Sequence, residues 1–115
     1  MRTPLVFGFL TGRYFAGEDF DPSDHRRRWS PEQLERWATA HQLFATLIDA
    51  GSGETPSQFA LRFCLSFDCV STVIPGMLKA EHVVENAEAS DLGRLPQPAC
   101  GTIAGIYREH GFHVN

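Results

Sequence analysis

Apolar residues recur at three- and four-residue spacing in the middle of the chain, which predicts two helices. The first begins at residues 30–33, Ser-Pro-Glu-Gln, and stops near Gly51. The second begins at residues 55–58, Thr-Pro-Ser-Gln, and continues through residues 59–65, which are apolar on nearly all sides. At each start the hydroxyl residue suits the cap, the proline suits the first position and the glutamine completes a capping box. An all-round apolar helix requires cover on more than one side, and such cover is hard to find within 115 residues, so we expect residues 59–65 to be left uncovered.

A short β-branched stretch follows these helices. Residues 70–75 are typical of a buried strand, and they form the one clear strand in the pattern. A single strand leaves its backbone donors and acceptors without partners, so the pattern indicates part of a larger α/β structure. Further helices are predicted at residues 79–89 and 99–109, with Gly93 and two prolines between them.

Two irregular segments precede the first predicted helix. Residues 4–15 mix apolar residues with Gly8 and Gly12 and show neither strand alternation nor a helical face, which favours a loop. Residues 16–29 carry an acidic cluster followed by a basic one, and such charge runs usually face water. We therefore expect a solvated excursion there.

Size and charge narrow the function classes. The 115 residues suffice for one small domain but fall far short of the roughly 250 of a complete (β/α)₈ barrel. The composition is 43% hydrophobic and 21% charged, with a net charge of -4, which is ordinary for a globular protein. Neither a nucleic-acid partner nor a membrane is indicated.

The cysteines and the first residues bear on the compartment. Cys64, Cys69 and Cys100 lack the short spacing of a metal site, and two of them lie in apolar runs, so we expect reduced thiols. The N-terminus has no signal-peptide pattern and no window is apolar enough to span a membrane. We expect a cytoplasmic protein.

Three segments carry a family resemblance. Residues 2–14 read Arg-Thr-Pro-Leu-Val-Phe-Gly-Phe-Leu-Thr-Gly-Arg-Tyr, residues 57–66 contain Ala-Leu-Arg-Phe, and residues 71–76 read Ser-Thr-Val-Ile-Pro-Gly and lead into a helix reaching residues 86–90. In this order they resemble the aldo-keto reductases, whose loop after the seventh strand reads Pro-Leu-x-x-Gly-x-Leu-Thr-Gly-Lys-Tyr. Members are (β/α)₈ barrels that reduce aldehydes and ketones with NADPH.

The resemblance implies a fold class and a division of the chain. We expect an α/β protein that is the C-terminal fragment of a (β/α)₈ TIM barrel, mostly helical as it stands. Residues 1–115 would form one partial domain. Its parts would be a cofactor loop with its excursion, two outer helices, the last strand with the nucleotide-binding helix, and a C-terminal helix with its tail, at residues 1–29, 30–67, 70–90 and 96–115.

The resemblance also implies a nucleotide site. After the strand, Gly76 would let the backbone approach an anion at a helix N-terminus. Taken singly, a Pro-Gly turn, a Glu-Asn pair or a histidine also has a plain structural explanation. Together, the residues that match cofactor-binding positions of the family are Arg2, Thr3, Leu5, Phe7, Gly8, Leu10, Gly76, Met77, Leu78, Lys79, His82, Glu85 and Asn86.

His82 departs from the family pattern. Many relatives have arginine or glutamine there, and histidine is only partly cationic near neutral pH. Lys79 lies nearby in sequence and would provide charge for a 2′-phosphate. NADP(H) is therefore favoured over NAD(H).

The family's catalytic aspartate, tyrosine, lysine and histidine belong to the earlier part of the barrel. Tyr14 and Tyr107 lie in no matching motif, so no catalytic residue is assigned and the isolated chain is expected to be inactive. The predicted function is the cofactor-binding part of an NADP-dependent reductase of small aldehydes or ketones. The alternative is a non-enzymatic remnant or nucleotide-binding module that depends on a partner, either the missing barrel half or a second copy. A channel β-type subunit of the same fold is a third possibility.

Overall fold

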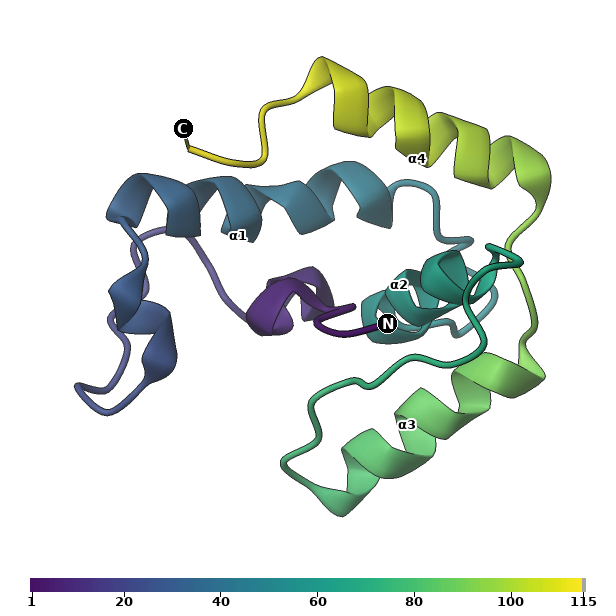
Figure 1. The fold of residues 1–115 in the computed structure, drawn as a ribbon, viewed down its shortest axis with the longest axis horizontal. Helices are drawn as coiled ribbons and strands as arrows, with labels where there is room; N and C mark the ends of the chain where they lie inside the picture. The colour runs from purple at the N-terminus through teal and green to yellow at the C-terminus, as the bar shows by residue number, and fades with distance from the viewer. Residues whose placement is uncertain (115) are drawn as a thin grey trace.

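The computed structural model describes residues 1–114 and is mostly helical (Figure 1). Two short 3₁₀ segments precede four α-helices in the order η1, η2, α1, α2, α3, α4. Their bounds are Val6–Thr11, His25–Arg28, Pro31–Ala45, Pro56–Leu65, Ala80–Asp91 and Gln97–Glu109. Figure 1 shows α4 above α1, α3 at the opposite edge and α2 between them, close to the N-terminus. Asn115, the end of the predicted tail, lies outside the described residues.

The two predicted helix starts are confirmed, but only one forms a full capping box. Ser30 Oγ and Thr55 Oγ1 each accept a backbone N–H from the glutamine three residues later, at 3.2 Å. Gln58 completes its box by accepting the Thr55 N–H at 3.0 Å. Gln33 instead bonds the C-terminal tail, so the predicted box at Ser30 is wrong. The side chain of Gln33 holds two tail backbone groups in place of its own cap.

The predicted strand at residues 70–75 is wrong. Among residues 1–114 the only β-pairing is an isolated parallel bridge between Arg2 and Ile74. The Ile74 N–H donates to the Met1 carbonyl at 3.0 Å, and the Met1 amino group donates to the Thr72 carbonyl at 2.8 Å. The segment is extended, but a ladder requires neighbouring strands along its whole length.

The expectation that α2 is left uncovered is wrong on two sides of the helix. Leu61 packs with Leu5 of the opening segment and Ala89 of α3. Phe59 packs with Leu95 and Ile103, on the side of α4. Both sides of α2 are thus occupied, which is why its apolar residues surround the helix.

The predicted solvated excursion is partly wrong. Phe20 is buried in a cluster with Phe9 and Trp37, and the guanidinium of Arg26 lies 4.0 Å from the ring centre of Tyr14. Part of the charged run therefore folds back over an aromatic cluster, whereas most of its other residues are exposed, as predicted. Of the helices described, none is long and apolar enough to cross a membrane.

Candidate functional site

A cavity of about 460 Å³ lies between the opening segment and the start of α3. The parallel bridge at Arg2 and Ile74 brings these segments together, so the loop that follows Arg2 and the turn that follows Ile74 open on the same side. This is the arrangement expected at the carboxyl ends of parallel strands, where ligands bind in α/β folds.

Most residues of the predicted nucleotide site line this cavity. The exceptions are Leu10, which lines a second cavity, and Lys79, which is exposed at the N-cap of α3. The predicted residues in the lining are Arg2, Thr3, Leu5, Phe7, Gly8, Gly76, Met77, Leu78, His82, Glu85 and Asn86.

A polar network crosses the cavity from the loop to α3. Arg13 Nη1 lies 2.7 Å from His82 Nε2, and its Nη2 lies 3.9 Å from Glu85 Oε2. The other oxygen of Glu85 accepts the Thr55 hydroxyl at 2.7 Å. Glu85 is therefore held by two partners, and Arg13 supplies the permanent positive charge beside His82.

The His82 ring lies between two hydrogen-bond donors. Its Nε2 accepts from Arg13 in the tautomer whose proton is on Nδ1, and its Nδ1 accepts the Leu78 N–H, at 3.3 Å, in the other tautomer. A neutral ring accepts only one of these bonds at a time, so the other donor is left for a ligand. Lys79 makes no side-chain cap at this helix start.

The cavity wall has room and an unused donor for a ligand. A side chain at Gly76 would meet nothing within 4 Å, so this position is open on the cavity side. The Asn86 Nδ2 is buried without a hydrogen-bond partner. An unpaired buried donor in a cavity wall is costly unless a ligand or water accepts from it.

Strained backbone marks the loop side of the cavity. Thr3, Val6 and Phe7 all have positive φ, at 57°, 47° and 55°. The left-handed region is unfavourable for such residues, above all for β-branched valine. Strain of this kind concentrates where a loop is held in a shape that function requires.

Two further residues at this cavity, Arg26 and His25, were not predicted from the sequence. Arg26 is held by Asp24 and lies over the rings of Tyr14 and Phe20. A hydrogen bond from Arg26 lowers the pKa of Asp24 to about 2, and the same bond raises the pKa of Arg26. His25 also lines the cavity. Only folding of the charged excursion brings these groups to the site, so no local sequence motif indicates them.

Arg13 was also not predicted, although a sequence motif pointed to it. It stands where the quoted family loop has lysine, in Thr-Gly-Lys-Tyr, yet it was not assigned to the site. The structure places it in the cavity lining beside His82. Within residues 1–114 no group of three or more His, Cys, Asp or Glu side chains is arranged to hold a metal ion.

Sequence comparison matches the chain to one protein family. The sequence model of the Aldo/keto reductase family matches residues 1–108. "Aldo-keto reductase str7" of Strobilurus tenacellus is 32% identical over 92 residues, which is 78% of this chain and 27% of the relative. "Aldo-keto reductase yakc [NADP(+)]" of Schizosaccharomyces pombe is 32% identical over 85 residues, 72% of this chain and 25% of the relative.

A relative with a different printed role also matches. The "Probable voltage-gated potassium channel subunit beta" of Oryza sativa subsp. japonica is 33% identical over 104 residues, 84% of this chain and 30% of the relative. The chain thus spans 25% to 30% of the length of these relatives. No solved structure matches the chain.

Proposed function

The chain belongs to the aldo/keto reductase family, and from that membership we propose that it is the nucleotide-binding part of an NADP(H)-dependent reductase of small aldehydes or ketones. One observation carries the proposal. The loop after Arg2 and the turn after Ile74, far apart in sequence, form the walls of one cavity. Both are segments to which the family resemblance assigns cofactor contacts.

The residues present suit a nicotinamide nucleotide. Arg2, Arg13 and Arg26 line the cavity, whereas Glu85 is its one acid, so the local charge favours an anion. The open position at Gly76 and the unpaired Nδ2 of Asn86 would be used on the side of α3. When bound, the nucleotide supplies the hydride.

NADP(H) is preferred over NAD(H) in this proposal. Arg13 lies against His82 at the start of α3, and its guanidinium is always charged. A 2′-phosphate adds negative charge that Arg13 would bind, whereas a 2′-hydroxyl adds none. Lys79 is expected from the sequence to provide the charge for the 2′-phosphate, and the proposal assigns that role to Arg13 instead.

We propose that the isolated chain transfers no hydride. In the family resemblance the catalytic tetrad precedes this region. Lys79, the single lysine of the chain, is exposed and lies outside the cavity lining. Tyr14 is covered by Arg26, so no tyrosine–lysine pair supports a general acid here.

A second candidate is a nucleotide-binding module that acts only with a partner supplying further barrel elements. The exposed apolar side chains of the last extended segment and α3 favour it. Ile74 is 64% exposed, and Val83 and Val84 are 51% and 59% exposed. Such residues on one side of a helix are normally covered by a neighbouring element.

Titration of the 115-residue chain with NADPH, followed by nucleotide fluorescence, tests the proposed site. We expect saturable binding that weakens about tenfold in Asn86→Ala, which removes the unpaired donor. Glu81→Ala is the matched control, because Glu81 is exposed on α3 outside the cavity. Absence of binding at millimolar NADPH would refute the site. NADPH oxidation by the isolated chain with a small aldehyde would refute the proposed inactivity.

A further inference from the structure

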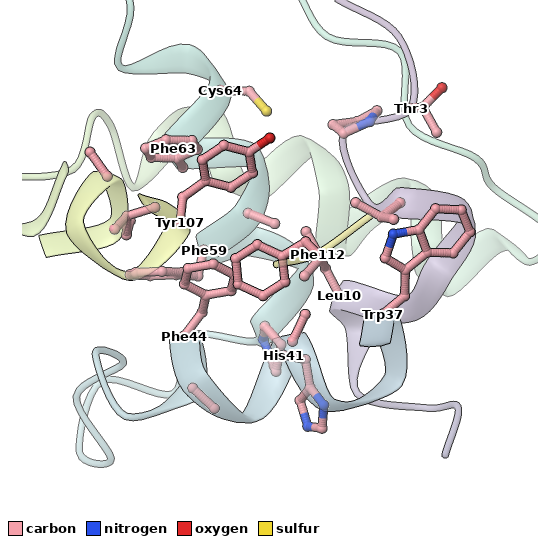
Figure 2. A pocket seen from close by; sticks show the side chains of 18 of the residues that line it. Thr3, Leu10, Trp37, His41, Phe44, Phe59, Phe63, Cys64, Tyr107 and Phe112 are labelled. Carbon is pink, nitrogen blue, oxygen red and sulfur yellow. The ribbon is translucent and has the colours of Figure 1, made fainter. Parts of the chain in front are cut away.

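A second cavity, of about 560 Å³, lies between α1, α2, α4 and the C-terminal tail. Its walls are mainly apolar and include aromatic side chains from three helices: Trp37 and Phe44 from α1, Phe59 and Phe63 from α2, and Tyr107 from α4 (Figure 2). The volume falls in the range of small-molecule sites, and apolar walls with few polar groups are their usual composition.

The C-terminal tail closes part of this cavity. The ring of Phe112 stacks on Tyr107 at 5.6 Å between centroids and lies 5.8 Å from that of Phe44. Gln33 fixes the tail by donating to the Phe112 carbonyl at 2.7 Å. The tail is therefore held by hydrogen bonds as one wall of the cavity, and it links α1 to α4.

The lining of this cavity contains no acidic side chain. Arg108 is its one permanently charged side chain, His41 and His113 also line it, and no aspartate or glutamate does. Arg108 has no acid within 4.0 Å in the part of the chain that the structure describes. The whole chain has a net charge of -4, so this acid-free lining departs from the overall balance. A single anionic group would complement it.

We propose that this cavity binds an apolar monocarboxylate, with its hydrocarbon part among the aromatic walls and its carboxylate at Arg108. A nucleotide does not fit this chemistry, because its phosphates and ribose would leave many polar groups against apolar walls. The site goes beyond the proposed nucleotide function and needs no nucleotide. Thr3 and Pro4 alone of the opening segment line both cavities.

Equilibrium dialysis of the full chain against labelled decanoate, below its micelle concentration, tests the proposal. We expect one saturable site that weakens about tenfold in Arg108→Gln, because a charge-assisted contact is lost. Arg27→Gln is the matched control, since Arg27 is exposed and lies outside the lining. Decanol, which lacks the charge, should bind about tenfold more weakly than decanoate.

A variant that fills the cavity provides a second test. Ala104 lines the cavity from the exposed side of α4, so Ala104→Trp should abolish decanoate binding while the helical circular dichroism is retained. The proposal is overturned if decanoate does not saturate, if both arginine variants weaken binding equally, or if decyltrimethylammonium binds as tightly. It is also overturned if sedimentation reveals a dimer that buries the cavity and excludes decanoate.

Discussion

The guanidinium of Arg13 lies 2.7 Å from Nε2 of His82, although 69 positions separate the two residues in sequence. This contact joins the opening loop to the start of α3 across the proposed nucleotide cavity. It also places a guanidinium, which is always charged, beside the histidine that stands where many relatives have arginine. Arg13 thus provides a permanent positive charge at this end of the cavity.

We predict that Arg13→Gln weakens NADPH binding about tenfold and NADH binding less than about twofold. The reason is that only NADPH carries the 2′-phosphate that Arg13 would bind. Parallel titrations with the two nucleotides measure the ratio, and Arg13→Lys should restore most of it. Equal losses for both nucleotides would show that Arg13 acts elsewhere on the cofactor.

The ion pair between Asp24 and Arg26 predicts an acid-sensitive contribution to stability. The pKa of Asp24 is lowered to about 2 from 3.8, first by its hydrogen bond from Arg26. Since the folded-state pKa lies below the unfolded one, the stabilisation is full above about pH 4 and is lost as pH falls towards 2. We expect Asp24→Asn to cost about 1 to 2 kcal/mol at pH 6 and much less at pH 2.5.

Urea unfolding at the two pH values measures this change. The control is Asp68→Asn, because Asp68 also pairs with an arginine, Arg94, but its side chain is 93% exposed. An exposed pair contributes little, so this variant should differ from the parent by less than about 0.5 kcal/mol. A pH-independent cost of Asp24→Asn would contradict the ion-pair explanation.

Gln33 and Gln58 show which structural features local sequence patterns predict. Both follow a hydroxyl residue and a proline at the same spacing, and both helix starts form as predicted. Only Gln58 closes its capping box, because the amide of Gln33 meets the backbone of the tail about 80 positions later. Helix starts depend on adjacent residues, whereas the final partner of a side chain depends on the whole fold.

The predicted strand at residues 70–75 failed for the same reason. β-branched residues favour an extended backbone, and the segment is bonded to residues 1–2 through its bridge. A strand ladder, however, depends on neighbours that no local pattern supplies. Gly76 and Asn86, which the family resemblance names, both line the cavity. The resemblance does not name Arg26, which lines the cavity from the folded-back segment whose Phe20 is buried.

Gln58 should be the more important glutamine for the nucleotide site. Its Nε2 donates to the Glu85 carbonyl at 3.1 Å and to Glu88 Oε2 at 3.0 Å, so it ties α2 to α3. We predict that Gln58→Ala costs about 2 to 3 kcal/mol, from the lost box and the unpaired buried groups. NADPH affinity should fall as well, since α3 carries His82 and Asn86.

Gln33→Ala is the matched comparison for that variant. It should also destabilise the chain, by about 1 to 2 kcal/mol, and speed hydrogen exchange at the Val114 amide, which donates to Gln33 Oε1 at 2.8 Å. NADPH affinity should stay unchanged, because the tail does not line the nucleotide cavity. Equal losses of NADPH affinity in the two variants would contradict the prediction. They would show that the affinity does not depend on the hydrogen bonds between α2 and α3.

Cys64 offers a probe of the packing around α2. It is 5% exposed, and burial raises the pKa of its thiol, whereas Cys69 is exposed. Two variants, each with one remaining cysteine, allow the comparison: Cys69→Ser, Cys100→Ser retains Cys64, and Cys64→Ser, Cys100→Ser retains Cys69. Cys64 should react with a disulfide reagent at pH 8 at least about tenfold more slowly than Cys69.

The expected difference has a physical reason. The thiolate is the reactive species, and a buried sulfur is reached mainly when its surroundings open. Low concentrations of urea should therefore accelerate the Cys64 reaction and leave the Cys69 reaction nearly constant. Equal rates in native buffer would contradict the protection of Cys64, whether the reagent enters through the second cavity, which Cys64 lines, or when α2 opens.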